Sequence, residues 1–402
     1  MSSVRVNMNS TSTGIDLLEK NLPVILRKRR IKNVGVLCHP SSATRQFRHL
    51  VSIVEKHSTI AALFGPQHGI HGETQDNMIE WQDTRDEKGR NVFSLYGERR
   101  KPTQDSLKNV ELMIVDLFDV GARYYTFIYT MAYMLEVCGE LDIPVLICDR
   151  PNPLGGDFIE GNILDLNFKS FVGMYELPVC HGMTIAELAK FFCSKMKNPP
   201  ELLISKMSKW KRKMHFPETK LPWTLPSPNM PNYEASVFYP GGCLLEATSL
   251  SEGRGTTRPF ELIGAPFLNW DEIEKEYLSI CKKLKLQPAI FHRQGFLPTF
   301  HKFSGEVCKG ALQSCSNPKK FFPLRHTVIL LWIFRKLYGS QWKWKEPPYE
   351  YEFKKLPIDI LAGGTTLRET VDQQKPLSEL FDSWKVDEAK FKKIRKEFLI
   401  YT

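Results

Sequence analysis

The feature that most constrains the fold is a series of short apolar runs in the first half of the chain, each followed by polar residues. The runs span 34–38, 60–64, 112–116 and 143–148. The segments 50–55 and 130–141, which lie between runs, have the apolar spacing of helices. Near-continuous apolar strands that alternate with helices are typical of a parallel sheet covered on both faces. We therefore predict an α/β fold for this half.

The polar residues that follow the strands are the most informative part of the sequence. In parallel sheets of this kind, ligands bind beyond the carboxyl ends of the strands. We therefore expect the polar clusters to converge on one cleft at that edge, closed from the other half of the chain by a glycine-rich loop at 251–258. The four clusters span 38–42, 65–72, 116–125 and 149–160.

The second half of the chain has a different texture. Five prolines between residues 217 and 231 punctuate a stretch that resists both helix and central strand. We place a domain boundary just beyond it, near 232–240. The predicted organisation is a Rossmann-like parallel-sheet domain over residues 14–235 and a smaller α+β domain over 236–402. In the smaller domain, short strands mix with helices predicted over 270–284, 324–338 and 387–399.

Length and charge limit the classes of protein. A chain of 402 residues exceeds what one hydrophobic core usually serves, which favours two domains. The 55 Lys and Arg residues outnumber the 45 Asp and Glu residues. This balance favours anionic partners in general, but an ordinary solvated basic surface explains it more simply. No RNA-recognition signature, paired-cysteine zinc pattern or long basic run accompanies the charge, so we expect no nucleic-acid partner.

Cysteine usage and the termini bear on the compartment. The nine cysteines are scattered without C-x-x-C pairs, and several lie in apolar runs, which favours buried free thiols in a reducing compartment. The N-terminus lacks the apolar core of a secretory signal. The longest apolar stretch, 328–334, is far shorter than the ~20 residues that span a bilayer. We expect a cytoplasmic protein without membrane association.

The common cofactor and nucleophile motifs are missing. The sequence has no G-x-G-x-x-G, G-x-x-x-x-G-K-[ST], H-E-x-x-H or G-x-S-x-G, so we expect no cofactor. His68 and His71 are three residues apart, but a metal site would need a third ligand such as Asp116 or His181. We favour hydrogen bonding by these histidines to a substrate or to the backbone, and no metal.

Several polar side chains near the strand ends are candidates for catalysis or binding. Asp116 and Asp119 end an apolar strand, where burial would raise a carboxyl pKa and Arg123 would lower it. Such carboxylates suit acid–base work, or they pair with Arg123 and hold the loop. Tyr124 and Tyr125 offer a flat apolar face with hydroxyl tips for a sugar ring, or they are core aromatics.

Two further loops carry candidate binding groups. Prolines fix the loop that presents Arg150 and Asn152, and Glu160 follows closely. Arg254 and Arg258 lie in the glycine-rich loop, and a guanidinium binds a carboxylate in two-pronged fashion. The alternative is that both are ordinary surface arginines.

Long motifs follow the order of one family: FGPQHGIHG (64–72), SLYG (94–97), DLFDVGARYYT (116–126), DRPNP (149–153), IEG (159–161), HGMT (181–184), PSPNMP (226–231), SEGRGTTRPF (251–260) and LPIDILAG (356–363). From about residue 14 to its end, the chain resembles the NamZ family of exo-acting peptidoglycan β-N-acetylmuramidases. The resemblance implies a Rossmann-like N-terminal domain, a smaller C-terminal domain and a cleft between them. It also implies release of N-acetylmuramic acid from the non-reducing ends of peptidoglycan fragments.

One position departs from the family pattern. The family loop usually reads Gly-Pro-Glu-His-Gly, and its glutamate is the leading candidate for an acid–base group, whereas this chain has Gln67. An amide cannot ionise or usefully give up a proton, and glycoside hydrolysis normally needs two carboxyl groups. Either Glu160 serves together with an aspartate, or the protein is a catalytically impaired binder of muropeptides or amino sugars.

The residues and the resemblance together define the predicted site. We expect Tyr125 to stack on the sugar, Glu160 to supply acid–base chemistry, His68 and Asn152 to position the sugar, and Arg254 or Arg258 to meet its lactyl carboxylate. The candidate catalytic residues are Gln67, Glu160, Asp116 and Tyr125. The candidate substrate-binding residues are His68, His71, Asp119, Arg123, Arg150, Asn152, His181, Arg254 and Arg258.

Overall fold

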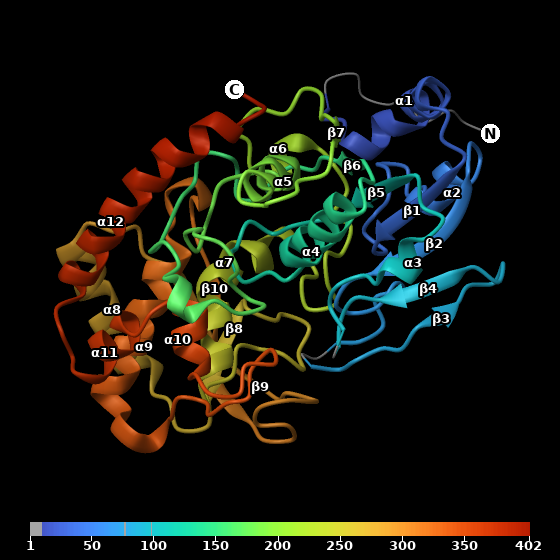
Figure 1. Ribbon diagram of the computed structural model, residues 1–402. Coiled ribbons are helices and arrows are strands. Elements are labelled where there is room, and N and C mark those ends of the chain that lie inside the picture. The colour runs from blue at the N-terminus through green and yellow to red at the C-terminus, as the bar shows by residue number, and fades with distance from the viewer. Residues whose placement is uncertain (1–9, 76–77, 98) are drawn as a thin grey trace, which may run out of the picture.

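The computed structural model describes residues 10–75, 78–97 and 99–402, and its first half is built around a seven-stranded sheet (Figure 1). The strands are β1 (Asn33–Cys38), β2 (Thr59–Gly65), β3 (Thr84–Arg85), β4 (Asn91–Ser94), β5 (Leu112–Asp116), β6 (Val145–Cys148) and β7 (Leu202–Ser205). Their order is β3-β4-β2-β1-β5-β6-β7, and every neighbouring pair is parallel except β3 and β4. The predicted parallel sheet is confirmed, and the four apolar runs form β1, β2, β5 and β6.

The strand order creates a switch point at β1. β2, β4 and β3 lie on one side of β1 in the sheet, whereas β5, β6 and β7 lie on its other side. Cys38 pairs in register with Asp116, so β1 and β5 end at the same edge. The connections that leave β1 and β5 run in opposite directions from this edge. Open α/β sheets bind ligands at such a point, beyond the carboxyl ends of the strands.

Alternate residues along the strands build two apolar layers. In β5, Leu112 and Ile114 pack in a cluster with α1 and α2, whereas Met113 and Val115 pack on the other face with α4 and α5. Both faces of the sheet are therefore covered, as the unbroken apolar runs predict. The helices of this half are α1 (Gly14–Arg29), α2 (Leu50–Val54), α3 (Gln104–Leu107), α4 (Phe127–Glu140), α5 (Ile185–Cys193) and α6 (Phe216–Thr219), with the 3-10 helix η1 (Leu166–Phe168).

The second half mixes helices with a small antiparallel sheet, in the order β8-β10-β9. Its strands are β8 (Leu262–Ala265), β9 (Ile290–Phe296) and β10 (Cys308–Ser314). Its helices are α7 (Tyr233–Gly242), α8 (Trp270–Leu284), α9 (Pro323–Tyr338), α10 (Pro357–Ala362), α11 (Thr366–Asp372) and α12 (Leu377–Ile394), with the 3-10 helices η2 (Cys243–Ala247), η3 (Pro318–Lys320), η4 (Gly339–Gln341) and η5 (Arg395–Phe398). The predicted α/β plus α+β composition is confirmed.

Helix α12 begins earlier than the sequence predicts. Its first residue is Leu377 rather than 387, because buried Leu380, Phe381 and Trp384 extend its apolar face toward the N-terminus. The predicted segment, 387–399, covers only the last turns of α12 and the 3-10 helix η5 that follows it.

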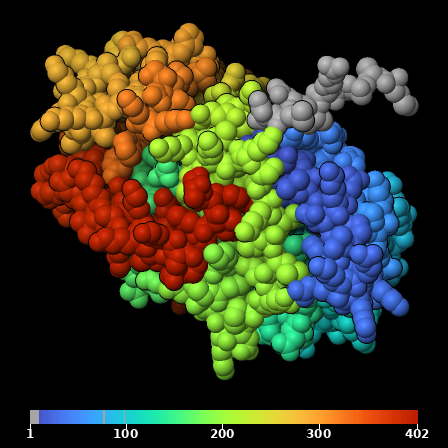
Figure 2. Space-filling model, turned by 90° about the horizontal axis from the view of Figure 1, so that it is seen from above, coloured from blue at the N-terminus to red at the C-terminus, as the bar shows by residue number. Residues whose placement is uncertain are grey.

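The last residues of the chain return to the first half. The Tyr401 hydroxyl donates to Asp149 at 2.6 Å, and the Ile400 N–H donates to Glu187 at 2.8 Å. Figure 2 shows this C-terminal segment lying against residues of the first half. The larger apolar cluster also continues from the sheet into α7, α9 and α10. The division at residues 235 and 236 therefore stays a prediction.

Two other expectations concern the thiols and the helices. All nine cysteines are free, and seven of them are buried, as predicted for thiols in apolar runs. Among the helices of the described residues, none has the length and apolar character needed to cross a membrane.

Candidate active site

A narrow pocket lies where the two halves of the chain meet. Its cavity volume is small, about 30 Å³, so the side chains around it are closely packed. The first half contributes Gln67, His68, Tyr124, Tyr125, Thr126, Val172, Ser227 and Asn229 to its lining. The second half contributes Tyr239, Glu246, Arg254, Phe260, Tyr349 and Glu350.

The pocket collects part of the predicted site. The clusters 65–72 and 116–125 and the loop 251–258 all contribute lining residues, whereas 38–42 and 149–160 contribute none. Two of the four clusters and the glycine-rich loop therefore meet at this pocket, and the convergence of all four stays a prediction. The predicted site residues that do line the pocket are Gln67, His68, Tyr125 and Arg254.

Gln67 is held by hydroxyl groups on both sides of its amide. It follows β2, just before a turn in which His68 has a φ of 72°. Its Oε1 accepts a hydrogen bond from Thr126 at 2.6 Å, and its Nε2 donates to the Tyr96 hydroxyl at 3.0 Å. An amide suits this place because it accepts on one side and donates on the other.

Tyr96 links Gln67 to Glu350. The Tyr96 oxygen also accepts the Met78 N–H at 2.9 Å, and its hydroxyl donates to the two Glu350 carboxyl oxygens at 3.0 and 3.2 Å. Burial raises the pKa of Glu350 to about 7, and the charge of Glu246 adds to the rise. The hydrogen bond from Tyr96 acts in the opposite direction. Near neutral pH, Glu350 therefore exchanges readily between its acid and its ionised form.

Glu246 is the second carboxyl group in the lining, and its environment is different. It accepts from Arg254 at 2.7 Å and from the Tyr349 hydroxyl at 2.8 Å. Burial acts to raise the pKa of Glu246, but the adjacent Arg254 guanidinium and these hydrogen bonds outweigh it and lower the pKa. The pocket thus holds two carboxyl groups whose pKa values are pushed apart, the pattern by which acid and base roles are divided.

Aromatic side chains form one wall of the pocket. Tyr125 and Tyr239 meet edge to face, with ring centroids 5.9 Å apart, and Phe260 packs against Tyr239 at 4.9 Å. Tyr125 donates its hydroxyl proton to the Pro226 carbonyl at 2.7 Å, and burial raises its pKa well above the ordinary value. Tyr125 therefore supplies a rigid apolar surface and stays neutral.

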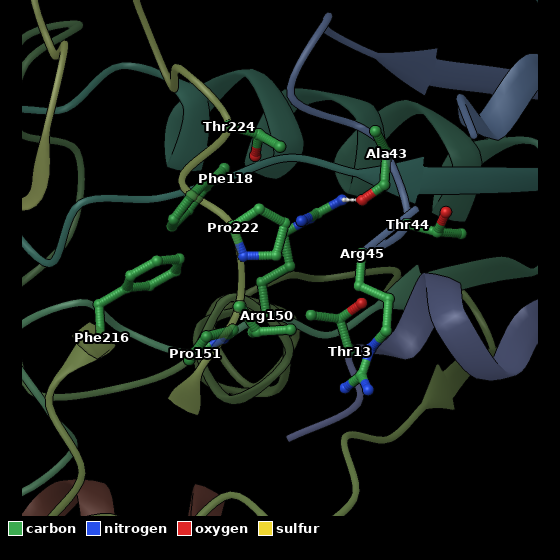
Figure 3. A pocket seen from close by; sticks show the side chains of 11 residues that line it. Thr13, Ala43, Thr44, Arg45, Phe118, Arg150, Pro151, Phe216, Pro222 and Thr224 are labelled. Carbon is green, nitrogen blue, oxygen red and sulfur yellow. Dashed lines mark hydrogen bonds between the residues drawn. The ribbon is translucent and has the colours of Figure 1, made fainter. Parts of the chain in front are cut away.

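Asp116 and Arg150 form a buried ion pair outside the pocket lining. Arg150 Nη2 donates to Asp116 at 2.8 Å and to the Ala43 carbonyl at 3.0 Å. Figure 3 shows Arg150 reaching toward Ala43 beside a separate hollow, near Phe118 and Pro222. Burial raises the pKa of Asp116, and Arg150 acts against the rise. The pair ties the ends of β5 and β6 to the 39–44 loop.

Arg123 is wholly buried and pairs with the backbone. The expected ion pair with an aspartate is not formed among the described residues. The guanidinium joins the first half to α10 instead, and Arg123 is absent from the pocket lining. Its nitrogens donate to the carbonyl oxygens of Asn162, Leu177, Leu361 and Ala362 at 2.8–3.0 Å.

Asp119, Asn152 and His181 stabilise the neighbouring loops. Asp119 accepts the Gly121 N–H at 2.9 Å, and His181 Nε2 lies 3.3 Å from the same carboxylate. Asn152 donates to the Met183 carbonyl at 3.1 Å. None of the three lines the pocket, so their predicted contact with substrate lacks a geometric basis.

Glu160 caps the start of α9. One carboxyl oxygen accepts the Leu324 N–H at 3.0 Å, and the other accepts the Arg325 N–H at 2.9 Å and the Arg325 guanidinium at 3.2 Å. Burial raises its pKa to about 7. The group is absent from the pocket lining, so the expectation that it supplies the acid–base chemistry conflicts with where it lies. The reason is the helix N-terminus, whose free N–H groups attract a carboxylate.

His71 and Arg258 also lie apart from the pocket. His71 lines a different hollow, together with His49 and Arg85. Arg258 is a surface arginine that pairs with Glu261 at 3.1 Å. Of the two arginines predicted to bind a carboxylate, Arg254 is the one in the pocket lining. Within the described residues, no three His, Cys, Asp or Glu side chains gather to hold a metal ion.

Sequence reasoning missed Tyr96, Glu246, Tyr349 and Glu350. Glu246 carried a usable signal, because an acid inside the apolar run 243–247 needs a buried partner. Glu350 follows two prolines and alternates with aromatics in the segment 347–353, but the sequence does not show which of its two glutamates faces inward.

Comparisons with known proteins place the chain in a family. Models of the exo-β-N-acetylmuramidase NamZ family match residues 34–234 with the N-terminal domain and residues 237–401 with the C-terminal domain. The peptidoglycan β-N-acetylmuramidase NamZ of Bacillus subtilis (strain 168) is 40% identical over 394 residues, which cover 97% of this chain and 91% of that protein. The chain belongs to the NamZ family.

Solved structures agree with this assignment. A crystal structure of a DUF1343 family protein from Bacteroides fragilis matches with a TM-score of 0.84 and 26% identity, covering 98% of this chain and 100% of that one. A second DUF1343 family protein from the same organism matches with a TM-score of 0.75 and 26% identity, over 98% and 99% of the two chains. Over 98% of its length, the chain therefore shares one fold with these proteins.

Proposed function

We propose that this protein is an exo-β-N-acetylmuramidase that releases N-acetylmuramic acid from the non-reducing ends of peptidoglycan fragments. The observation that carries the proposal is membership of the NamZ family over nearly the whole chain, including a relative named for this activity. The pocket supports it, because glycoside hydrolysis uses two carboxyl groups and the lining provides Glu246 and Glu350.

The lining also suits the particular sugar. N-Acetylmuramic acid differs from N-acetylglucosamine by a lactyl group that carries a carboxylate. Arg254 is the guanidinium in the lining, and we propose that it meets this carboxylate. The wall of Tyr125 and Tyr239 offers an apolar face for the ring, and Asn229 offers an amide for its hydroxyl groups.

A direct test compares two aryl glycosides that differ in the lactyl group. The purified protein should hydrolyse an aryl β-N-acetylmuramide and leave the matching β-N-acetylglucosaminide intact. Muropeptide chains should lose one sugar at a time from ends that carry N-acetylmuramic acid, as mass spectrometry would show. Binding of muramides without any turnover would reject the enzyme and identify a carbohydrate-binding protein.

A further inference from the structure

We propose that Glu350 is the general acid of this pocket, the group that gives its proton to the glycosidic oxygen. This inference rests on the proposed function and specifies the residue that performs its central step. Its basis is the geometry around one carboxyl group that no motif in the sequence singled out.

The hydrogen bonds around Tyr96 have a defined direction. The amide nitrogen of Gln67 and the Met78 N–H both donate to the Tyr96 oxygen. The hydroxyl proton of Tyr96 is therefore left for Glu350, which it reaches at 3.0 Å. A fixed donor of this kind orients the carboxyl group in a wall of the pocket, where a substrate oxygen can meet it.

The charges that face Glu350 come from several elements. Glu246 of η2 favours the protonated form, whereas Arg254 from the loop before β8 and Arg100 favour the ionised form. Arg254 is itself paired with Glu246 at 2.7 Å. Glu350 has no such guanidinium within ion-pair distance among the described residues. It can therefore carry a proton into the reaction, while Glu246 stays ionised.

The chemical step follows from this arrangement. Glu350 transfers its proton to the glycosidic oxygen as the bond between that oxygen and C1 breaks. The electron pair of the bond stays with the oxygen, and the leaving sugar departs as an alcohol. Water supplies the new oxygen on C1, and the proton that this water loses restores the carboxyl group of Glu350. The ionised Glu246 favours the positive charge that develops at C1.

The decisive experiment varies the leaving group. A dinitrophenyl β-N-acetylmuramide needs little protonation of its leaving group, whereas a β-N-acetylmuramyl disaccharide depends on it. Glu350→Gln should lower kcat/KM for the disaccharide by about 10²–10⁴-fold and for the dinitrophenyl substrate by less than about tenfold. The fall of kcat/KM above pH 7 should disappear in this variant. Glu352→Gln, the same change two residues away in a turn, is the matched control and should behave as wild type.

The possible outcomes are separable. Equal losses on both substrates, or an unchanged alkaline limb in Glu350→Gln, would overturn the assignment. If that variant does not fold, Tyr96→Phe provides the test. It removes a hydrogen bond that lowers the pKa of Glu350, so the alkaline limb should move to higher pH, and an unmoved limb would reject the proposal. A wild-type protein inactive on both muramides would instead refute the proposed function, and this inference with it.

Discussion

The start of α9 and the pocket each bury a glutamate whose pKa is raised to about 7, Glu160 in the first case and Glu350 in the second. Their surroundings differ in the donors that each accepts from and in whether a pocket adjoins the group. Glu160 accepts two backbone N–H groups and a guanidinium. Glu350 accepts the hydroxyl of Tyr96 and faces a pocket.

The difference teaches that a perturbed pKa does not identify a catalytic group by itself. Burial raises the pKa in both places, but N–H donors occupy both carboxyl oxygens of Glu160. A carboxyl group acts on a substrate only where the substrate can reach it. The same distinction separates the Asp116–Arg150 pair from the Glu246–Arg254 pair, since only the second lines the pocket.

The largest effect on stability should come from breaking the ion pair outside the pocket. Asp116→Asn leaves Arg150 buried without its partner charge, which should lower the free energy of unfolding by about 3–5 kcal/mol. Urea denaturation would measure the loss. Turnover per folded molecule should stay close to wild type. A catalytic defect larger than the folded fraction explains would show that Asp116 does belong to the active site.

The two glutamates should contribute alike to the pH dependence of stability. Each has a folded pKa of about 7 against an ordinary 4.5, so each favours folding fully below pH 4.5 and loses its contribution as the pH rises to 7. The change is on the order of 3 kcal/mol for each group. Glu160→Gln and Glu350→Gln should each reduce the pH dependence of the free energy of unfolding between pH 4.5 and 8. Only Glu350→Gln should alter the pH profile of kcat/KM.

A pair of arginines sharpens the comparison further. Arg254→Lys keeps the charge but loses the two-pronged geometry. This variant should bind N-acetylmuramic acid more weakly than wild type, by about 1.5–3 kcal/mol of binding free energy. The binding free energy of N-acetylglucosamine, which has no lactyl carboxylate, should change much less. Arg258→Lys should change neither affinity, because Arg258 lies at the surface with Glu261. Inhibition constants for the two sugars provide the measurement, and equal losses in Arg254→Lys would indicate a structural role for Arg254.

The sequence predicts the sheet but only part of the site, because the residues that meet in the site are far apart in the sequence. Apolar runs such as 112–116 determine a strand locally, whatever lies elsewhere in the chain. The partner of Tyr96 in the pocket is 254 residues away, and the partner of Glu160 is 165 residues away. No local pattern shows that α9 begins beside Glu160 or that Glu350 reaches Tyr96. Strand-end position therefore identified Tyr125 together with loop-stabilising residues such as Asn152, whereas Gln67 was identified by comparison with the family motif.

The smallest expected effect is the rate change in Gln67→Glu, and whether the rate falls or rises is informative. In Gln67→Glu, a carboxylate replaces the amide that donates to Tyr96 and accepts from Thr126. An ionised Glu at position 67 would compete with Glu350 for the Tyr96 proton and add a nearby negative charge, and both effects raise the pKa of Glu350. We expect the alkaline limb of kcat/KM to move to higher pH and the rate on a muramyl disaccharide to fall by about tenfold, or roughly 1.4 kcal/mol. A gain of about 10²–10⁴-fold would instead show that position 67 is an acid–base site that an amide has silenced. Because amide and carboxyl are nearly the same size, packing is unchanged and the direction of the change decides between Glu350 and position 67.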